Sequence, residues 1–324
     1  MIKLDADITE LTTFGVPAQA AALATWSSVE ELITLLNDAS LPRPMKMIGG
    51  GSNMLFTKKF EGTVLLRQGT PQVIKNGLEW TVDAHCVLDD LCGMVAAEGQ
   101  RGAENLSGIP GTLGGALVQN AGAYGAETGE FLVKARLVDI HTGEEIEVDR
   151  EWMQYAYRAS RLKAEPDRYI IIDATLRFQG AEAPANLGYG HLGALLEGQE
   201  PTPQAVRNAV LSMRNAKLPM PEVVGSAGSF FRNPEVSAEL LQEEMPRFEL
   251  GSGLYKVPAA WLIDKCGLKG MSVGGASVWQ SQPLVIVNTE GKASADDVVA
   301  LEQKIIAAVE AKYSITLNPE VEHL

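Results

Sequence analysis

Residues 105–125 read NLSGIPGTLGGALVQNAGAYG, and six of these 21 residues are glycine. Glycine at this density is unfavourable in the interior of a helix or a strand, so the segment is expected either to be disordered or to wrap a flat, rigid ligand. Its apolar residues disfavour disorder; they are Leu106, Ile109, Leu113, Leu117 and Val118. We therefore predict an ordered loop that surrounds a ligand.

A second glycine cluster, GGGSN at 49–53, follows the apolar stretch MKMI at 45–48. Glycine permits the tight turn and the close backbone approach that a phosphate needs, although a purely structural turn is an equally good interpretation. The cluster is not the GxGxxG fingerprint, because Met54 stands where its third glycine would fall, and the chain contains no P-loop motif. Together, the two glycine loops suggest an extended ligand held between two lobes, such as a dinucleotide.

Periodicity and turn residues predict helices and strands throughout the chain. The spacing of Ser27 and Glu30 is that of a capping box that opens a helix. Residues 134–149 have the form of a hairpin that turns at His141-Thr142-Gly143. Further helices are expected at 87–98, 203–213, 259–266 and 295–309, and further strands at 45–48, 63–68, 78–85 and 169–178. This mixture predicts an α+β protein of several domains.

The composition limits the possible partners. A chain of 324 residues is long enough for two or three domains, and its net charge of −14 argues against binding to nucleic acid or anionic lipid. An anionic substrate is compatible with this charge only where local Arg and Lys residues attract it. The three cysteines imply no disulfide framework, and the spacing of His85, Cys86 and Cys92 fits no zinc site, so we expect no metal.

The first residues, MIKLDADITELTTF, carry acidic side chains where a secretory signal has basic ones and an apolar core. No apolar run approaches the roughly 20 residues that a membrane-spanning helix needs. We therefore expect a cytoplasmic protein without a membrane segment.

Several segments resemble one family of flavoproteins. IGGGSNML at 48–55 and GAENLSGIPGTLGGALVQNAGAYG at 102–125 resemble the FAD-binding signature of UDP-N-acetylenolpyruvoylglucosamine reductases. YRASRLK at 157–163, GSAGSFFRNP at 225–234 and NPEVEHL at 318–324 are similar to further segments of that family. The similar segments occur in order along nearly the whole chain. The family belongs to the wider fold of vanillyl-alcohol-oxidase-like flavoproteins.

The resemblance implies an α+β protein of three domains, in which two lobes hold FAD without a covalent bond and a third covers the substrate. The expected boundaries are 1–67 for the first FAD-binding lobe, 68–212 for the second and 213–315 for the substrate-binding domain, with the tail 316–324 returning to the first lobe. NADPH is implied as the hydride donor and a nucleotide-sugar as the substrate. The chain is expected to act as a monomer.

The resemblance also implies which residues contact the ligands. Those expected at the cofactor are Gly49, Gly50, Gly51, Ser52, Asn53, Met54, Leu55, Ser107, Gly108, Ile109, Pro110, Gly111, Gly114, Gly115, Gln119, Asn120, Ala121, Gly122, Ala123 and Tyr124. Those expected at the substrate are Tyr157, Tyr189, Lys217, Asn233 and Gln282. Tyr189 lies between two glycines, a pattern that in this family marks the subtype with a tyrosine on a mobile substrate loop.

Three residues are expected to carry the reduction of the enolpyruvyl group. The guanidinium of Arg158 suits the substrate carboxylate because it is planar and permanently charged. Ser229 resembles the family's proton donor and Glu320 its third catalytic residue. Without the resemblance, Arg158 would be read as a surface ion-pair partner, Ser229 as a turn hydroxyl like its neighbour Ser226, and Glu320 as a solvated residue.

The chain departs from the family pattern at its tail. Glu322 and His323 stand where a basic and an aromatic residue are usual, which puts the anchoring of Glu320 in question. Two rival functions remain: an FAD oxidase of sugars or alcohols, and a flavin- or nucleotide-binding regulator without turnover. Arg158, Ser229 and Glu320 together argue against both.

Overall fold

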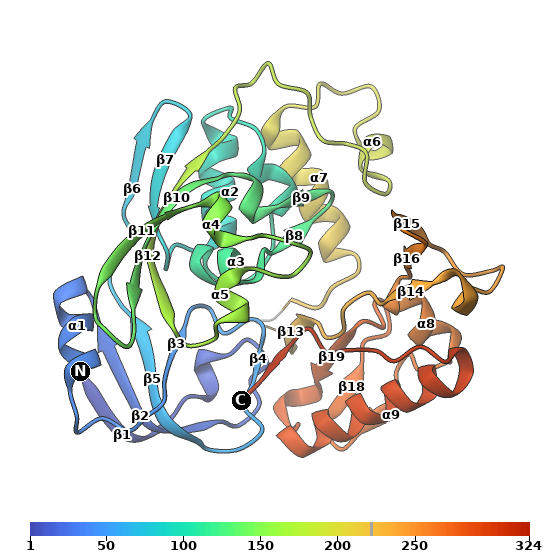
Figure 1. Cartoon of the computed structure of the whole chain (residues 1–324). Helices are drawn as coiled ribbons and strands as arrows, with labels where there is room; N and C mark the ends of the chain where they lie inside the picture. Colours follow the sequence, from blue (N-terminus) through green and yellow to red (C-terminus); the bar gives the residue numbers. More distant parts are fainter. Residues whose placement is uncertain (221–222) are drawn as a thin grey trace. The chain divides into compact units, whose positions relative to one another are not determined.

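The structure is a computed structural model, in which residues 1–220 and 223–324 are described. Helices and mainly antiparallel strands are mixed along the chain, as expected for an α+β protein (Figure 1). The chain forms two compact units and passes between them repeatedly. Unit 1 consists of Met1–Ala6, Ala20–Gly50 and Glu61–Arg214, and unit 2 of Asp7–Gln19, Gly51–Phe60 and Asn215–Leu324. The division into domains at 67, 212 and 315 stays a prediction.

The first sheet of unit 1 has the strand order β1-β2-β5-β3, with β3 and β5 parallel. Its strands are β1 (Ile2–Asp7), β2 (Gln19–Trp26), β3 (Met45–Ile48) and β5 (Phe60–Arg67). Helix α1 (Val29–Asn37) buries Leu32, Leu35 and Leu36 in the core beside this sheet. Its cap differs by one residue from the prediction: the Ser28 hydroxyl accepts from Glu31 N–H at 3.3 Å.

The carboxylate of that same Glu31 accepts from the N–H and the hydroxyl of Ser27, at 2.7 and 2.8 Å. Ser27, the residue before the N-cap Ser28, is therefore bonded to the Glu31 side chain. The expected pairing of Ser27 with Glu30 was wrong because two serines stand side by side, and spacing alone does not show which of them leaves the helix.

The second sheet of unit 1 is antiparallel, in the order β11-β10-β12-β7-β6. Its strands are β6 (Val73–Asn76), β7 (Glu79–Asp83), β10 (Leu132–Asp139), β11 (Glu145–Asp149) and β12 (Tyr169–Arg177). The predicted hairpin is confirmed as β10 and β11.

Helix α2 (Leu88–Ala97) ends before Gly99, whose φ is +71°, and packs with the fully buried Trp80 in one core. The other helices of this unit are α3 (Leu113–Gln119), α4 (Arg150–Met153), α5 (Arg161–Ala164), α6 (Leu192–Leu195) and α7 (Pro203–Asn215).

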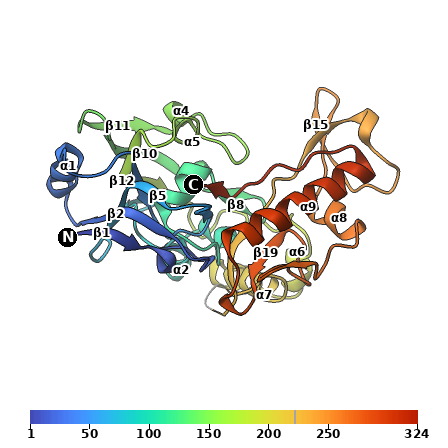
Figure 2. The same cartoon turned by 90° about the horizontal axis from the view of Figure 1, so that it is seen from below.

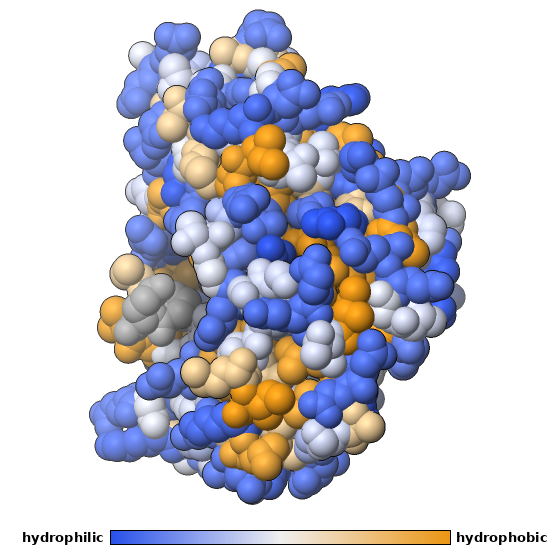
Figure 3. Space-filling view, turned by 90° about the vertical axis from the view of Figure 1, so that its left-hand side faces the viewer, coloured by the Kyte–Doolittle hydropathy of each residue, from blue (hydrophilic) through white to orange (hydrophobic). Residues whose placement is uncertain are grey.

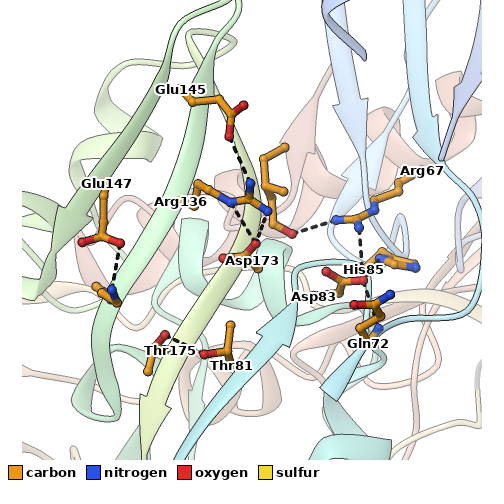
Figure 4. A network of polar contacts seen from close by, with 12 residues as sticks. Arg67, Gln72, Thr81, Asp83, His85, Arg136, Glu145, Glu147, Asp173 and Thr175 are labelled. Carbon is orange, nitrogen blue, oxygen red and sulfur yellow. Dashed lines mark hydrogen bonds and ion pairs between the residues drawn. The ribbon is translucent and has the colours of Figure 1, made fainter. Parts of the chain in front are cut away.

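A polar network joins the two sheets of unit 1 (Figure 4). Arg67 at the end of β5 donates to the carbonyl of Ile172 at 2.8 Å and pairs with Asp83 at 3.1 Å. On the second sheet, Arg136 bridges Asp173 at 2.6 Å and Glu145 at 3.1 Å across neighbouring strands. Because Arg67 and Asp83 are largely buried, their pair is screened less than an exposed one and helps to hold the sheets together.

The glycine-rich segment is ordered, as predicted, but it is not wholly a loop. It contains α3, which holds Gly114 and Gly115 in its first turn. A Cβ on Gly114 would lie 3.1 Å from the Ala84 side chain, so this glycine permits close packing of the helix on the end of β7. The expectation that glycine density excludes a helix was wrong here because packing overrides helix propensity.

The two glycine segments meet within unit 1. A Cβ on Gly49 would lie 2.4 Å from Thr112 Oγ1, and one on Gly50 would lie 2.6 Å from Gly111 Cα. Real Cβ atoms do not approach other atoms so closely, so residues 49–50 must be glycine for the segments to touch.

Unit 2 contains a four-stranded antiparallel sheet, β13-β19-β18-β17, and a three-stranded antiparallel sheet, β14-β16-β15. The strands are β13 (Gly225–Ser229), β14 (Glu235–Ser237), β15 (Phe248–Gly251), β16 (Leu254–Lys256), β17 (Ser272–Val273), β18 (Ala276–Val278) and β19 (Val285–Asn288). Helices α8 (Ala259–Lys265) and α9 (Ala295–Tyr313) pack with the larger sheet around one core (Figure 2). A full capping box of Ser294 and Asp297 opens α9, as the predicted start requires.

The face in Figure 3 is a mosaic of hydrophilic and hydrophobic residues, as on most globular proteins. Within the described residues, no helix is both long and apolar enough to cross a bilayer. The same residues contain no group of three or more His, Cys, Asp or Glu side chains placed to hold a metal ion.

Two alanine substitutions test whether the glycines serve backbone packing. Gly50→Ala is expected to lower the free energy of unfolding by about 1–3 kcal/mol, because the new Cβ collides with Gly111. Gly115→Ala is the matched control: its Cβ would meet Thr112 Oγ1 at an ordinary 3.7 Å, so the change should be neutral or stabilising by up to about 1 kcal/mol. Urea denaturation of the two purified variants measures the difference. Equal stability would show that the segments do not need this close contact.

Candidate active site

The expected cofactor residues fall on both units. Gly49, Gly50 and residues 107–124 belong to unit 1, whereas residues 51–55 belong to unit 2. Within unit 1, the contact between the two glycine segments brings together residues that are about sixty positions apart in the sequence. In unit 2, Gly51 has a φ of +57°, and a Cβ there would lie 1.9 Å from the Leu11 carbonyl oxygen. After this turn the chain forms β4 (Met54–Leu55).

Hydrogen bonds hold the glycine-rich segment in place. Leu113 N–H donates to Cys86 O at 2.8 Å, and Gly114 N–H donates to Ala84 O at 2.7 Å. Gly108 N–H donates to the Asp89 carboxylate at 2.6 Å. These three hydrogen bonds therefore fix the path of the segment against residues 84–89.

Two buried hydroxyls suggest that unit 1 fits a polar ligand. Ser107 Oγ and Tyr155 Oη are buried and have no hydrogen-bond partner among the described residues. Leaving such a group unsatisfied costs about 1–3 kcal/mol, which a polar ligand group can offset. Ser107 belongs to the expected cofactor set, so its hydroxyl agrees with a polar ligand at this segment.

The loop that carries Tyr189 is bonded to the glycine-rich segment. Asn105 is buried, and its Nδ2 donates to Tyr124 O at 2.8 Å and to Asn186 O at 2.9 Å. Asn186 donates back to Gly125 O at 3.0 Å. The ring of Tyr189 meets the ring of Tyr124 edge-on at 5.7 Å and remains half exposed. The expected substrate tyrosine thus lies beside an expected cofactor residue of the same unit.

Arg158 is oriented by backbone carbonyls. Its Nη2 donates to Gly122 O at 2.8 Å and its Nη1 to Asn120 O at 3.4 Å. Its guanidinium carbon lies 5.2 Å from the centre of the Tyr157 ring. Arg158 itself has a φ of +52°, a conformation that costs a non-glycine residue free energy and often occurs at functional sites.

Asn120 has a structural role that the sequence did not reveal. This buried residue ends α3 in the left-handed conformation, at a φ of 49°. Its Nδ2 donates to Glu127 at 2.7 Å and to Ala156 O at 3.0 Å, and its Oδ1 accepts from Gly129 N–H at 3.0 Å. Its side chain therefore fixes the turn before Arg158, while its own carbonyl accepts from the Arg158 guanidinium. The signal in the sequence was the asparagine itself, because asparagine is one of the residues that end a helix in the left-handed conformation.

Ser229 lies at an irregular point of β13. Ser226 pairs with Val287, but Ser229 pairs with Val285, so β13 has one residue more than β19 over this stretch. Such a bulge turns a side chain to a new direction, and Gly228 before it has a φ of +70°. As a result Ser229 is exposed, whereas Ser226 is buried. Burial therefore distinguishes the expected proton donor from its neighbour.

The segment that carries Glu320 is bonded to residues 230–232 of unit 2. Glu320 N–H donates to Phe230 O at 2.7 Å, and Arg232 N–H donates to Asn318 O at 2.9 Å. These bonds place residues 318–320 antiparallel to residues 230–232. Asn53 Nδ2 also donates to Glu320 O at 3.1 Å. The segment that bears Glu320 is thus bonded to the residue that follows Ser229.

Beyond Glu320 the tail remains anchored in unit 2. Its strand β20 (Glu322–His323) pairs in parallel with β4, close to the C mark in Figure 1. Glu322 N–H donates to Asn53 O at 3.0 Å, and Leu324 N–H donates to Leu55 O at 2.9 Å. The departures from the family tail therefore do not prevent docking, because backbone groups form these bonds whatever the side chain.

The other expected substrate residues lie in unit 2. Lys217 is exposed, and its carbonyl accepts from the Trp279 indole at 3.0 Å. Asn233 Oδ1 accepts from Ala259 N–H at 2.9 Å at the start of α8, so this side chain also orders a helix end. The carbonyl of Gln282 accepts from Val285 N–H at 3.0 Å.

Comparisons with known proteins show the family and the fold of the chain. A family profile described as UDP-N-acetylenolpyruvoylglucosamine reductase, C-terminal domain, matches residues 219–324. A profile described as FAD binding domain matches residues 20–149. The UDP-N-acetylenolpyruvoylglucosamine reductase from Neisseria gonorrhoeae is 38% identical to this chain, and the alignment covers 98% of this chain and 96% of that protein.

The reductase of the same name from Bacteroides fragilis is also 38% identical, with 95% of this chain and 96% of that protein aligned. The crystal structure of UDP-N-acetylenolpyruvylglucosamine reductase from Thermus caldophilus matches with a TM-score of 0.72 at 25% identity, over 100% of this chain and 99% of that one. These matches confirm the predicted fold class, an FAD-binding module followed by the reductase C-terminal domain. The chain belongs to the family of UDP-N-acetylenolpyruvoylglucosamine reductases.

Proposed function

We propose that this chain reduces UDP-N-acetylglucosamine enolpyruvate to UDP-N-acetylmuramate, with NADPH as the hydride donor and a non-covalently bound FAD, in the synthesis of peptidoglycan precursors. Family membership supports an FAD-dependent oxidoreductase. The observation that carries the proposal is the pairing of two segments in unit 2. Glu320 N–H donates to Phe230 O at 2.7 Å, so the backbone of Glu320 is bonded to the residue that follows the exposed Ser229.

The residues that would hold FAD are the two glycine segments, 49–55 and 107–124. When bound, FAD supplies hydride transfer from NADPH to the enolpyruvyl group. The unpartnered Ser107 hydroxyl and the absence of side-chain bulk at residues 49–50 support a polar ligand along these segments.

The remaining chemistry belongs to the chain itself. Negative charge develops on the carbon next to the substrate carboxylate, so the site needs a cation, a proton donor and a polarising group. Arg158 would bind the carboxylate, since its guanidinium is held by two carbonyls and keeps its charge. Ser229 would give its proton to the carbanionic carbon. Glu320 would polarise the carboxylate or relay protons.

Tyr157, Tyr189, Lys217, Asn233 and Gln282 would contact the nucleotide-sugar. Lys217 supports this because it is an exposed cation in a chain of net charge −14, where a diphosphate needs local positive charge. We also propose that the enzyme works in the cytoplasm as a monomer. Its three free cysteines agree with a reducing compartment.

A flavin titration tests the function directly. The purified protein should be yellow, lose its colour with NADPH under anaerobic conditions, and regain it with UDP-N-acetylglucosamine enolpyruvate but not with a simple enol ether. A protein that binds no FAD would refute the proposal. Rapid oxygen consumption with a simple polyol, without reoxidation by the nucleotide-sugar, would instead indicate an oxidase.

Ser229→Ala separates the two half-reactions. Reduction of the flavin by NADPH should stay near the wild-type rate, because no proton donor is needed there. Reoxidation by the enolpyruvyl substrate should slow by several orders of magnitude, roughly 10²–10⁴-fold or more, because the proton donor is lost. Ser226→Ala, a change at the buried serine of the same strand, is the matched control. Anaerobic stopped-flow absorbance measures both steps, and equal slowing of both would show that Ser229 is structural.

Arg158→Lys keeps the positive charge but loses the planar fork. We expect a higher KM for the enolpyruvyl substrate and a lower kcat, because a lysine cannot bind a carboxylate in two places. Steady-state kinetics with each substrate varied in turn provide the measurement. An increase in KM for NADPH alone would contradict the assignment to the carboxylate.

A further inference from the structure

The C-terminal tail carries an ion pair that the proposed chemistry does not use. His323 Nε2 lies 2.8 Å from a carboxylate oxygen of Glu302, and His323 Nδ1 lies 3.2 Å from Val321 O. A neutral imidazole has one N–H, whereas the Val321 carbonyl and an ionised Glu302 carboxylate both accept hydrogen bonds. With Glu302 ionised, both bonds form together when the ring is a doubly protonated imidazolium. The hydrogen bond to Glu302 accordingly raises the pKa of His323, against the opposing effect of burial.

The partner in this pair belongs to the core of unit 2. Glu302 lies on α9 and is only 5% exposed, between the buried residues Leu301 and Ile305. A carboxylate at such a position is costly without a cation beside it. His323 is the last residue of β20, only three positions after Glu320. The pair therefore connects the tail to the long helix of the same unit.

The His323 ring also contacts Phe230, which follows Ser229 and is bonded to Glu320. It meets the Phe230 ring edge-on, with the centroids 6.0 Å apart and the planes at 81°. Phe230 is fully buried, follows Ser229 in the chain, and accepts the hydrogen bond from Glu320 N–H. Phe230 also packs on Phe14 and Phe231. Phe230 therefore links the three residues: its ring contacts His323, and its backbone is joined to Ser229 and to Glu320.

We propose that His323, as an imidazolium paired with Glu302, is a positioning residue that holds Glu320 and Ser229 in their reactive arrangement. This inference rests on the proposed function of those two residues. The pair is one side-chain anchor of the tail, besides the bonds that the Asn53 and Thr57 side chains donate to tail carbonyls. The pairing of β20 and the bonds of Leu324 supply the backbone anchor. The pair acts on the half-reaction with the enolpyruvyl substrate and has no part in the reaction with NADPH.

A purely structural role would give a different result. If the pair only satisfied the buried carboxylate, its effect on the rates would follow its effect on stability. His323→Ala leaves Glu302 unpaired and should lower Tm. In the double variant Glu302→Gln and His323→Ala, the buried charge is gone, so Tm should recover towards the wild-type value, but the tail still lacks its side-chain contact with α9.

The experiment compares these variants of the FAD-loaded full chain with wild type and with His141→Ala, a change at an exposed histidine in the β10–β11 turn. Tm is measured by thermal denaturation, and both half-reactions are measured by anaerobic stopped-flow with NADPH and with UDP-N-acetylglucosamine enolpyruvate. We expect reoxidation by the substrate to slow by about 10- to 100-fold in both His323 variants, the effect of a small misplacement of reacting groups. Flavin reduction should stay within about twofold of wild type, because the pair has no part in that step.

Recovery of the reoxidation rate together with Tm in the double variant would overturn the inference, and so would equal slowing of both half-reactions. If His323→Ala does not fold, the double variant alone decides the question. Failure of the proposed function itself is recognised separately, because wild-type flavin would then not be reoxidised by the enolpyruvyl substrate at all.

Discussion

The close approach of backbone to backbone at the glycine turn is the constraint on which the proposed site depends. At residues 49–51 the chain leaves a buried strand and turns where no side chain fits. A Cβ would collide with Thr112 at the first glycine, with Gly111 at the second and with Leu11 at the third. Glycine is therefore needed at residues 49–51 for steric reasons, because a residue with a Cβ atom would collide with these neighbours.

Backbone carbonyls and strand irregularities then determine the directions of the expected catalytic side chains. Arg158 donates to the carbonyls at the end of α3, and its own backbone has a positive φ. Ser229 is turned outwards by a bulge in β13. Glu320 is held by the hydrogen bond that its backbone N–H donates to the Phe230 carbonyl. Each of the three residues is thus held by backbone groups. Backbone groups are the same for nearly every residue type, so such bonds tolerate changes of the neighbouring side chains.

This arrangement explains why an atypical tail can keep its place. The family pattern led us to question the anchoring of Glu320, since the usual basic and aromatic residues are missing. Parallel pairing of β20 with β4 requires only N–H and C=O groups. The side-chain contribution comes from a different source, the His323 imidazolium beside Glu302. A search for the usual residue types would not find it, because the partner is 21 positions away on a helix.

The sequence by itself determined the α+β class, the hairpin at 134–149, the start of α9 and the family, because periodicity, capping residues and ordered motifs are local properties of the chain. It placed the first helix one serine too early and missed α3, since neighbouring serines compete for the cap and packing on Ala84 outweighs glycine's low helix propensity. Only the tertiary structure decided that Ser229 is exposed while Ser226 is buried, that Asn120 fixes the turn before Arg158, and that His323 meets Glu302 and Phe230. These outcomes depend on strand register and on contacts between residues far apart in the chain, which no local pattern encodes.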